Sequence, residues 1–273
     1  MATIPAAFLM LLLAQGGGQA PGTAALTADA RQHYNAGRAA EALALIRPVL
    51  ARPGEPAAAA LVAARSLLEQ YRVTGEQADL GAARDHLRAI DPSLLTPRER
   101  RELMVGLAEA LFLEESFGAA AELFDAALSG FGASQADRAE RERTLDWWAT
   151  SLDRAAQLKP QAERRLVYRR IADRMERESR EHPGSTPAAY WLAAGARGAG
   201  ELDRAWSAAI AAWLRAPMTL DRGAALRADI DRLVQTALIP ERARSLAPGP
   251  KEIEEARVGL QAEWDLLKKN WTR

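Results

Sequence analysis

The residue types that most often carry catalysis or hold metals are scattered along this chain of 273 residues. His33, His86 and His182 are the only histidines, and they lie far apart in sequence. Cysteine is absent, which removes thiol nucleophiles, iron–sulfur clusters and cysteine-based zinc sites. The sequence also has no HExxH motif, no GxSxG turn and no glycine-rich phosphate loop. It therefore predicts no catalytic residue, no metal site and no cofactor, and a protein that is not an enzyme.

Charged residues of both signs are mixed along the chain. Adjacent carboxylates, Glu114 with Glu115 and Glu254 with Glu255, diverge by about 100° on a helix and cannot act as a pair. The chain has 36 basic and 36 acidic residues, which argues against a nucleic-acid partner because phosphate binding requires excess positive charge. Residues 161–182 hold seven arginines beside five acidic residues. We expect a salt-bridged outer helix surface there, with a patch for an acidic partner as the alternative.

The elements that must position these side chains are helices. Alanine accounts for 60 residues, whereas valine and isoleucine together account for 15, and no stretch alternates at period two. Proline and glycine interrupt the chain at intervals that fit helix ends. Thr96-Pro97 followed by Glu99 predicts a capping box, and Ser185 or Thr186 before Pro187 predicts another helix start. The sequence thus predicts an all-α protein of helix pairs joined by short turns.

Some pairs share a pattern of glycine, aromatic, alanine and proline positions. The first pair has it at Tyr34, Gly37-Arg38, Glu41-Ala42, Ile46, Leu50 and Pro53. The last pair has it at Leu192, Gly200-Glu201-Leu202, Ala205, Ala209, Ala212 and Pro217, and a third stretch has Phe117, Ala120, Phe124, Ala127 and Leu128. This pattern resembles the tetratricopeptide repeat, a helix pair of about 34 residues. The resemblance implies a right-handed α-solenoid of about five antiparallel hairpins followed by C-terminal capping helices.

The spacing of these units is irregular. We take as markers the alanines expected where the two helices of each pair cross, namely Ala42, Ala83, Ala120, Ala162 and Ala205. Successive markers are more than 34 residues apart, and the second and fourth units depart most from the family pattern. The predicted organisation is a signal peptide at 1–20, a flexible linker at 21–25, helical repeats at 26–217, an additional helix and loop at 218–250, and an amphipathic capping helix at 251–273.

The resemblance also implies where a partner would bind. In tetratricopeptide arrays a concave groove is lined by the first helix of each pair. Transferring these positions by register gives Arg31, Tyr34, Asn35, Arg65, Glu69, Glu102, Glu109, Phe112, Tyr190 and Arg197, with Trp147 or Trp148 from the fourth pair, of which we take Trp148. Rigid aromatic area combined with charged groups is typical of a peptide-binding surface, although long helices expose such residues without any binding role.

The last helix has an apolar face of its own. Ile253, Leu260, Trp264, Leu267 and Trp271 recur at helical spacing. We expect this helix to cap the repeats, and a partner-binding face is the alternative. All seven tryptophans follow residue 146, and Trp206 and Trp213 are expected in the core.

The N-terminal stretch indicates export. Residues 6–14 form an apolar run with the length of a signal-peptide core, well short of the ~20 residues that a membrane-spanning helix needs. Gly18-Gln19-Ala20 fits a cleavage site, but no Lys or Arg precedes the apolar run. We expect an exported, periplasmic protein without a stable membrane span; a cytoplasmic location follows if the true start lies upstream.

The functional expectation is an interaction module. It is an exported, tetratricopeptide-like adaptor or scaffold whose groove binds a protein or peptide segment of another envelope protein. This rests on how the family is used, since fold alone does not give function. The alternatives are a structural protein that forms homo-oligomers through Trp264 and Trp271, and an envelope protein that binds glycans or small molecules.

Overall fold

The computed structural model describes residues 22–51, 54, 56–132, 134–219 and 221–272. This described part is helical throughout and contains no strand, as predicted. The expected signal segment at 1–20 lies outside the described residues. Within the described residues, no helix has both the length and the apolar character needed to cross a membrane.

The first half of the chain folds into helices joined by short turns. They are α1 (Thr23–Asn35), α2 (Ala39–Leu50), α3 (Ala57–Thr74), α4 (Gln77–Ala89), α5 (Pro97–Leu113) and α6 (Phe117–Leu128), with a short 3₁₀ turn at Pro92–Leu94. Helix α1 begins at Thr23, so part of the stretch expected as a linker is helical.

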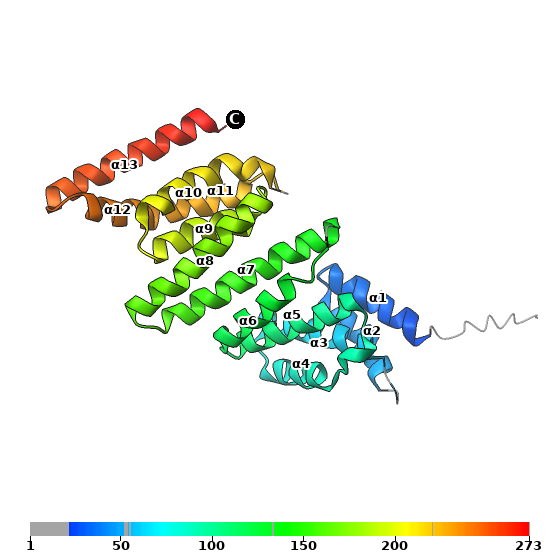
Figure 1. The fold of residues 1–273 in the computed structure, drawn as a ribbon. Coiled ribbons are helices and arrows are strands. Elements are labelled where there is room, and N and C mark those ends of the chain that lie inside the picture. Colours follow the sequence, from blue (N-terminus) through cyan, green and yellow to red (C-terminus); the bar gives the residue numbers. More distant parts are fainter. Residues whose placement is uncertain (1–21, 52–53, 55, 133, 220, 273) are drawn as a thin grey trace, which may run out of the picture.

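The second half continues with longer helices. They are α7 (Gln135–Gln157), α8 (Gln161–Glu181), α9 (Thr186–Gly198), α10 (Leu202–Arg215), α11 (Ala224–Leu233), α12 (Ile239–Leu246) and α13 (Pro250–Trp271). A 3₁₀ turn follows α10 at Ala216–Met218, and a π-helical segment, Val234–Leu238, joins α11 to α12. The expected additional helix therefore extends to Leu246. Each helix packs mainly on its neighbours in sequence, and α1 and α13 lie at opposite ends of the molecule (Figure 1).

Local capping explains where several helices begin and end. The Thr96 hydroxyl accepts from the Glu99 N–H while the Glu99 carboxylate accepts from the Thr96 N–H, which confirms the predicted capping box. Ser185 caps α9 by accepting from the Ala188 N–H. Gly75 ends α3 with φ of 74°, a left-handed conformation that favours glycine.

Small residues allow the helices of most pairs to approach closely. The marker alanines Ala42, Ala83, Ala120 and Ala205 are all fully buried. Ala162 is exposed, so the prediction for the fourth pair was wrong. The physical reason is that the start of α8 is exposed and does not pack against α7 where the two helices of a pair were expected to cross. Helix α8 packs more extensively on α9 than on α7. Ala162 was chosen by sequence spacing, and alanine is too common here for spacing alone to identify a contact.

The C-terminal helix closes the end of the core. Trp264 is fully buried between Trp206 and Trp213, at ring-centroid distances of 5.9 and 5.5 Å. Its indole N–H donates to the Asp231 carboxylate at 2.8 Å. Of the predicted face, Leu260 is also buried, Ile253 and Leu267 are half-buried against the same core, and Trp271 is 60% exposed. Most of this face is therefore occupied inside the chain.

The arginine-rich helix α8 is laced with ion pairs, as predicted. Arg170 pairs with Glu122 at 3.0 Å and Arg174 with Asp125 at 2.9 Å, both across to α6. Leu166 of the same helix is 62% exposed. The apolar contacts of α8 come from Ile171 and Met175, which are fully buried.

Candidate functional site

The first helices of the first four pairs share a surface, which we call the odd-helix face. It is formed by Arg31 and Tyr34 of α1, Arg65 and Arg72 of α3, Glu102, Glu109 and Phe112 of α5, and Trp147 of α7. These residues contact one another across helices that are distant in sequence. Arg31 pairs with Glu102, and it also lies 3.4 Å from Glu99.

The central contact of the odd-helix face is a nearly buried ion pair. A terminal guanidinium nitrogen of Arg65 lies 3.1 Å from a carboxylate oxygen of Glu109, and the two side chains are 12% and 7% exposed. Arg65 also donates to the Glu102 carbonyl and lies over the Tyr34 ring, 5.6 Å from its centroid. Burial acts to lower the pKa of Arg65, but the neighbouring Glu109, Tyr34 and Glu102 raise it above its ordinary value. The charge of Arg65 is therefore fixed and locally neutralised.

An aromatic group continues the odd-helix face toward α7. Phe112 and Trp147 meet edge to face at 4.8 Å, and Arg72 lies 5.1 Å above the Trp147 ring. We predicted that Trp148 would line the groove, but it is 1% exposed and belongs to the core. The two tryptophans are adjacent on α7 and project about 100° apart, so only one can face the groove.

A second surface, a hollow that we call the α9 cleft, lies further along the chain. Its volume is about 600 Å³, and Asp153 of α7, Tyr168 of α8 and Tyr190, Trp191 and Arg197 of α9 line it together with residues of α10 to α12. The Tyr168 hydroxyl donates to Asp153 at 2.7 Å, and the Trp191 indole N–H donates to Asp146 at 2.7 Å. The cleft therefore combines aromatic rings with carboxylates.

Close packing of α8 on α9 shapes this cleft. A side-chain carbon added at Gly198 would clash with the Tyr168 ring, and one added at Gly195 would lie 3.1 Å from the Ala172 backbone nitrogen. Arg197 makes a two-pronged ion pair with Glu241 of α12, at 2.5 and 3.0 Å. This pair joins the far wall of the cleft to α9.

The predicted groove residues are divided between these two surfaces. The odd-helix face brings together Arg31, Tyr34, Arg65, Glu102, Glu109 and Phe112, and Glu69 pairs beside them with Arg72 at 3.0 Å. Asn35 is exposed at the end of α1. Tyr190 and Arg197 line the α9 cleft.

The reasoning from sequence missed several members of these surfaces. Arg72 lies seven residues after Arg65, and this spacing was a usable signal for the same helix face. Asp146 and Asp153 are likewise seven apart on α7. Tyr168 had no such signal, because it reaches the cleft from the second helix of its pair, through the packing of α8 on α9.

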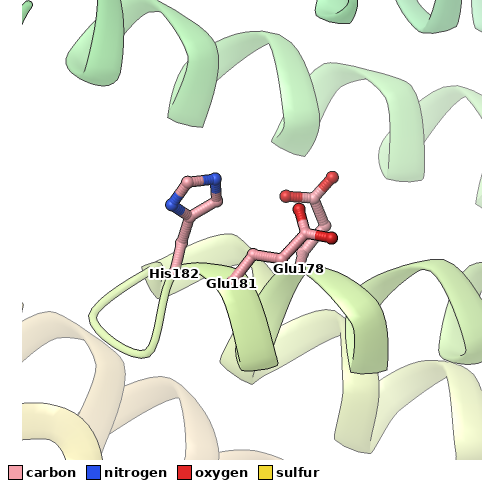
Figure 2. A group of neighbouring side chains, drawn as sticks. All are labelled: Glu178, Glu181 and His182. Atoms are coloured by element: carbon pink, nitrogen blue, oxygen red, sulfur yellow. The ribbon is translucent and has the colours of Figure 1, made fainter. Parts of the chain in front are cut away.

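A third cluster, at the end of α8, has the donor types of a metal site. Glu178, Glu181 and His182 each place a ligand atom within 4.8 Å of the others (Figure 2). We had not expected this group, although the Glu-x-x-Glu-His order places all three on one helical turn. Glu178 already accepts from Arg141 at 2.6 Å and from Arg174 at 2.9 Å. Burial raises the pKa of Glu178, but these two arginines outweigh it and hold the pKa below its ordinary value. A metal ion bound by Glu178 would have to displace both guanidinium groups, so Glu178 serves as an ion-pair junction.

Comparison with family models, with curated proteins and with solved structures finds no match to this chain. Functional inference therefore depends on the two surfaces themselves.

Proposed function

We propose that this protein is an interaction module: an exported, irregular tetratricopeptide-like solenoid that binds a segment of another envelope protein along the odd-helix face and the α9 cleft. The observation that carries the proposal is the assembly of the odd-helix face. Residues separated by more than 100 positions, from Arg31 to Trp147, form one continuous surface of aromatic rings and charged groups.

The chemistry of this surface suits a peptide. Tyr34, Phe112 and Trp147 offer rigid rings that are only half-buried, so they retain area for a ligand. The side chains around them are held by cross-helix ion pairs, and such preorganisation lowers the entropic cost of binding. Successive helices repeat this arrangement along the chain, which suits an extended segment rather than a compact small molecule.

Homo-oligomerisation through the C-terminal helix has less support. Leu260 and Trp264 are buried within the chain, and Ile253 and Leu267 are half-buried, so Trp271 alone of that face is exposed. Even with the exposed Val258 and Leu266 of the same helix, Trp271 offers less than the roughly 800 Å² per partner that is usual for a stable interface.

Site-specific photocrosslinking in the natural host tests the proposal. A photoreactive phenylalanine is placed at Tyr34, Phe112 and Tyr190 and, as matched controls, at exposed Arg47 of α2 and Asp85 of α4. We expect one protein to be captured from the first three positions and not from the controls. The crosslinked segment, made as a synthetic peptide, must then bind the purified protein.

Equal capture from the control positions would contradict a groove, and capture of the chain by itself at Trp271 would favour the oligomer. The mass of the mature N-terminus tests export separately. We expect a cut near residue 20, whereas a natural protein that begins at Met1 would contradict export.

A further inference from the structure

We propose that the α9 cleft accepts a lysine or arginine side chain of the bound segment. This rests on the proposed function and adds the chemistry of its partner. Asp153, Tyr190 and Trp191 line the cleft and would receive the cation. Asp146, which accepts from Trp191, and Asp229 of α11 lie outside that lining and add negative charge beside it.

The negative charge of this region is not neutralised within the chain. Asp146 accepts from the neutral Trp191 indole, and Asp153 accepts from the neutral Tyr168 hydroxyl and the Gln157 amide. Across the described residues, no basic nitrogen lies within 4.0 Å of either carboxylate. Among the described residues, the ion-pair partner of Asp229 is Arg232 of its own helix, at 3.4 Å, and that arginine is 73% exposed.

The basic residues that line the cleft are directed elsewhere. Both terminal contacts of Arg197 go to Glu241, and Arg164 donates to the Lys159 carbonyl. Arg165 lies beside Gly200, and within the described residues it makes no ion pair with either α7 aspartate. These arginines therefore leave the aspartates available to an external cation.

Aromatic rings favour an organic cation over a metal ion. Tyr190 and Trp191 meet edge to face at 5.4 Å, and both are half-buried. A cation above such rings gains attraction from their negative faces, whereas hard metal ions need a shell of oxygen ligands. Within the described part of the chain the Tyr190 hydroxyl has no hydrogen-bond partner, so it is free to contact the bound segment.

The electrostatics of Tyr190 agree with a negative environment. Burial raises the pKa of this tyrosine, Asp229, Asp153 and Asp146 raise it further, and the charge of Arg197 lowers it by a smaller amount. The same three carboxylates would attract a positive side chain, and a cation placed among them would regain the favourable interactions that the isolated protein lacks.

Selection from displayed random dodecapeptides tests this inference with the purified full chain at about 0.15 M salt. We expect lysine or arginine to be enriched at one position of the selected peptides. With the best peptide, the double variant Asp146→Asn and Asp229→Asn should raise Kd about tenfold or more. The asparagine oxygen can still accept from Trp191, so the double variant removes charge and keeps that hydrogen bond.

A matched control removes the same charge elsewhere. Asp85→Asn with Asp203→Asn alters two carboxylates that are 72% and 89% exposed on second helices, and it should change Kd within about twofold. Replacing the basic residue of the peptide by norleucine should raise Kd as much as the double variant does. The two changes together should raise Kd little further. Thermal melting checks that each variant is folded.

The outcomes separate the two proposals. Peptides that bind without an enriched basic residue, or whose Kd is unchanged in the double variant, would overturn the cation site and leave the interaction module standing. If no peptide binds the wild-type chain, the proposed function itself is contradicted.

Discussion

The odd-helix face and the α9 cleft use similar side chains but differ in how their charges are balanced. On the odd-helix face Arg65 lies against Glu109, and Arg31 lies against Glu99 and Glu102. At the α9 cleft, the hydrogen bonds that the described residues make to Asp153 and to the neighbouring Asp146 all come from neutral donors. A surface whose charges are already paired gains rigidity, whereas one with unpaired charges gains more from a charged ligand.

The difference follows from helix packing. In the first three pairs buried alanines hold the two helices together, so the first helices align and their long side chains meet. In the fourth pair Ala162 is exposed and α8 packs on α9. The hollow that results is lined by Asp153, Tyr168 and Tyr190. The cleft therefore lies beside the pair whose two helices pack least on each other.

The largest effect is expected from breaking the buried pair of the odd-helix face. Glu109→Gln leaves the Arg65 charge nearly buried without its counter-ion, and we expect the free energy of unfolding to fall by about 3 kcal/mol. Urea unfolding followed by circular dichroism measures it. Glu122→Gln, which alters a pair whose carboxylate is 65% exposed, should change stability by less than about 0.5 kcal/mol. Equal losses of stability in the two variants would show that the nearly buried pair contributes no more than the exposed pair.

A smaller loss is expected from crowding the α9 cleft. Gly198→Ala places a methyl group against the Tyr168 ring and should cost about 1–3 kcal/mol. Gly259→Ala is the matched control, because nothing lies within 4 Å of its added carbon in the middle of α13. In Gly259→Ala the better helix propensity of alanine should raise the free energy of unfolding by about 0.5–1 kcal/mol. Stabilisation by Gly198→Ala would mean that α8 and α9 do not pack this closely.

The sequence was sufficient for some of these features and insufficient for others. Helical structure follows from alanine content and from caps such as Thr96, which depend on nearby residues alone. The register of α1, α3 and α5 was also predictable, because Arg65 and Glu109 fall on the expected faces. The choice between Trp147 and Trp148 was wrong, since a helix rotation of one residue reverses it. The α9 cleft depends on contacts between α8 and α9 that no local pattern specifies.

A pH-dependent contribution is expected at the edge of the odd-helix face. Burial alone would raise the pKa of Glu99, but hydrogen bonds from Thr96 and the charge of Arg31 lower it below 4.5 overall. Its ionised form therefore adds stability above pH 4.5, and this is lost as pH falls through the lower folded value. Glu99→Gln should lower the free energy of unfolding by about 0.5 kcal/mol at neutral pH, and this difference between the variant and the wild type should disappear in acid. A difference that stays constant with pH would contradict this.

The smallest effect is expected at Asp146, with the opposite sign. Burial, offset in part by Trp191 and reinforced by Asp229, raises its pKa above 3.8. Its favourable contribution is therefore complete below pH 3.8 and is lost as pH rises through the folded value. Because part of this side chain stays open to solvent, which screens its charge despite the packing around the carboxylate, Asp146→Asn should stabilise by less than about 0.5 kcal/mol at neutral pH and by less still in acid.

Adding the selected basic peptide should favour the wild-type chain over the Asp146→Asn variant. The peptide should raise the melting temperature of the wild-type chain more than that of the Asp146→Asn variant, because only the wild type pairs the cation with an ionised carboxylate at this position. If the variant gained as much from the peptide as the wild type, the unpaired charge of Asp146 would have no part in binding, and the contrast between the two surfaces would reduce to packing alone.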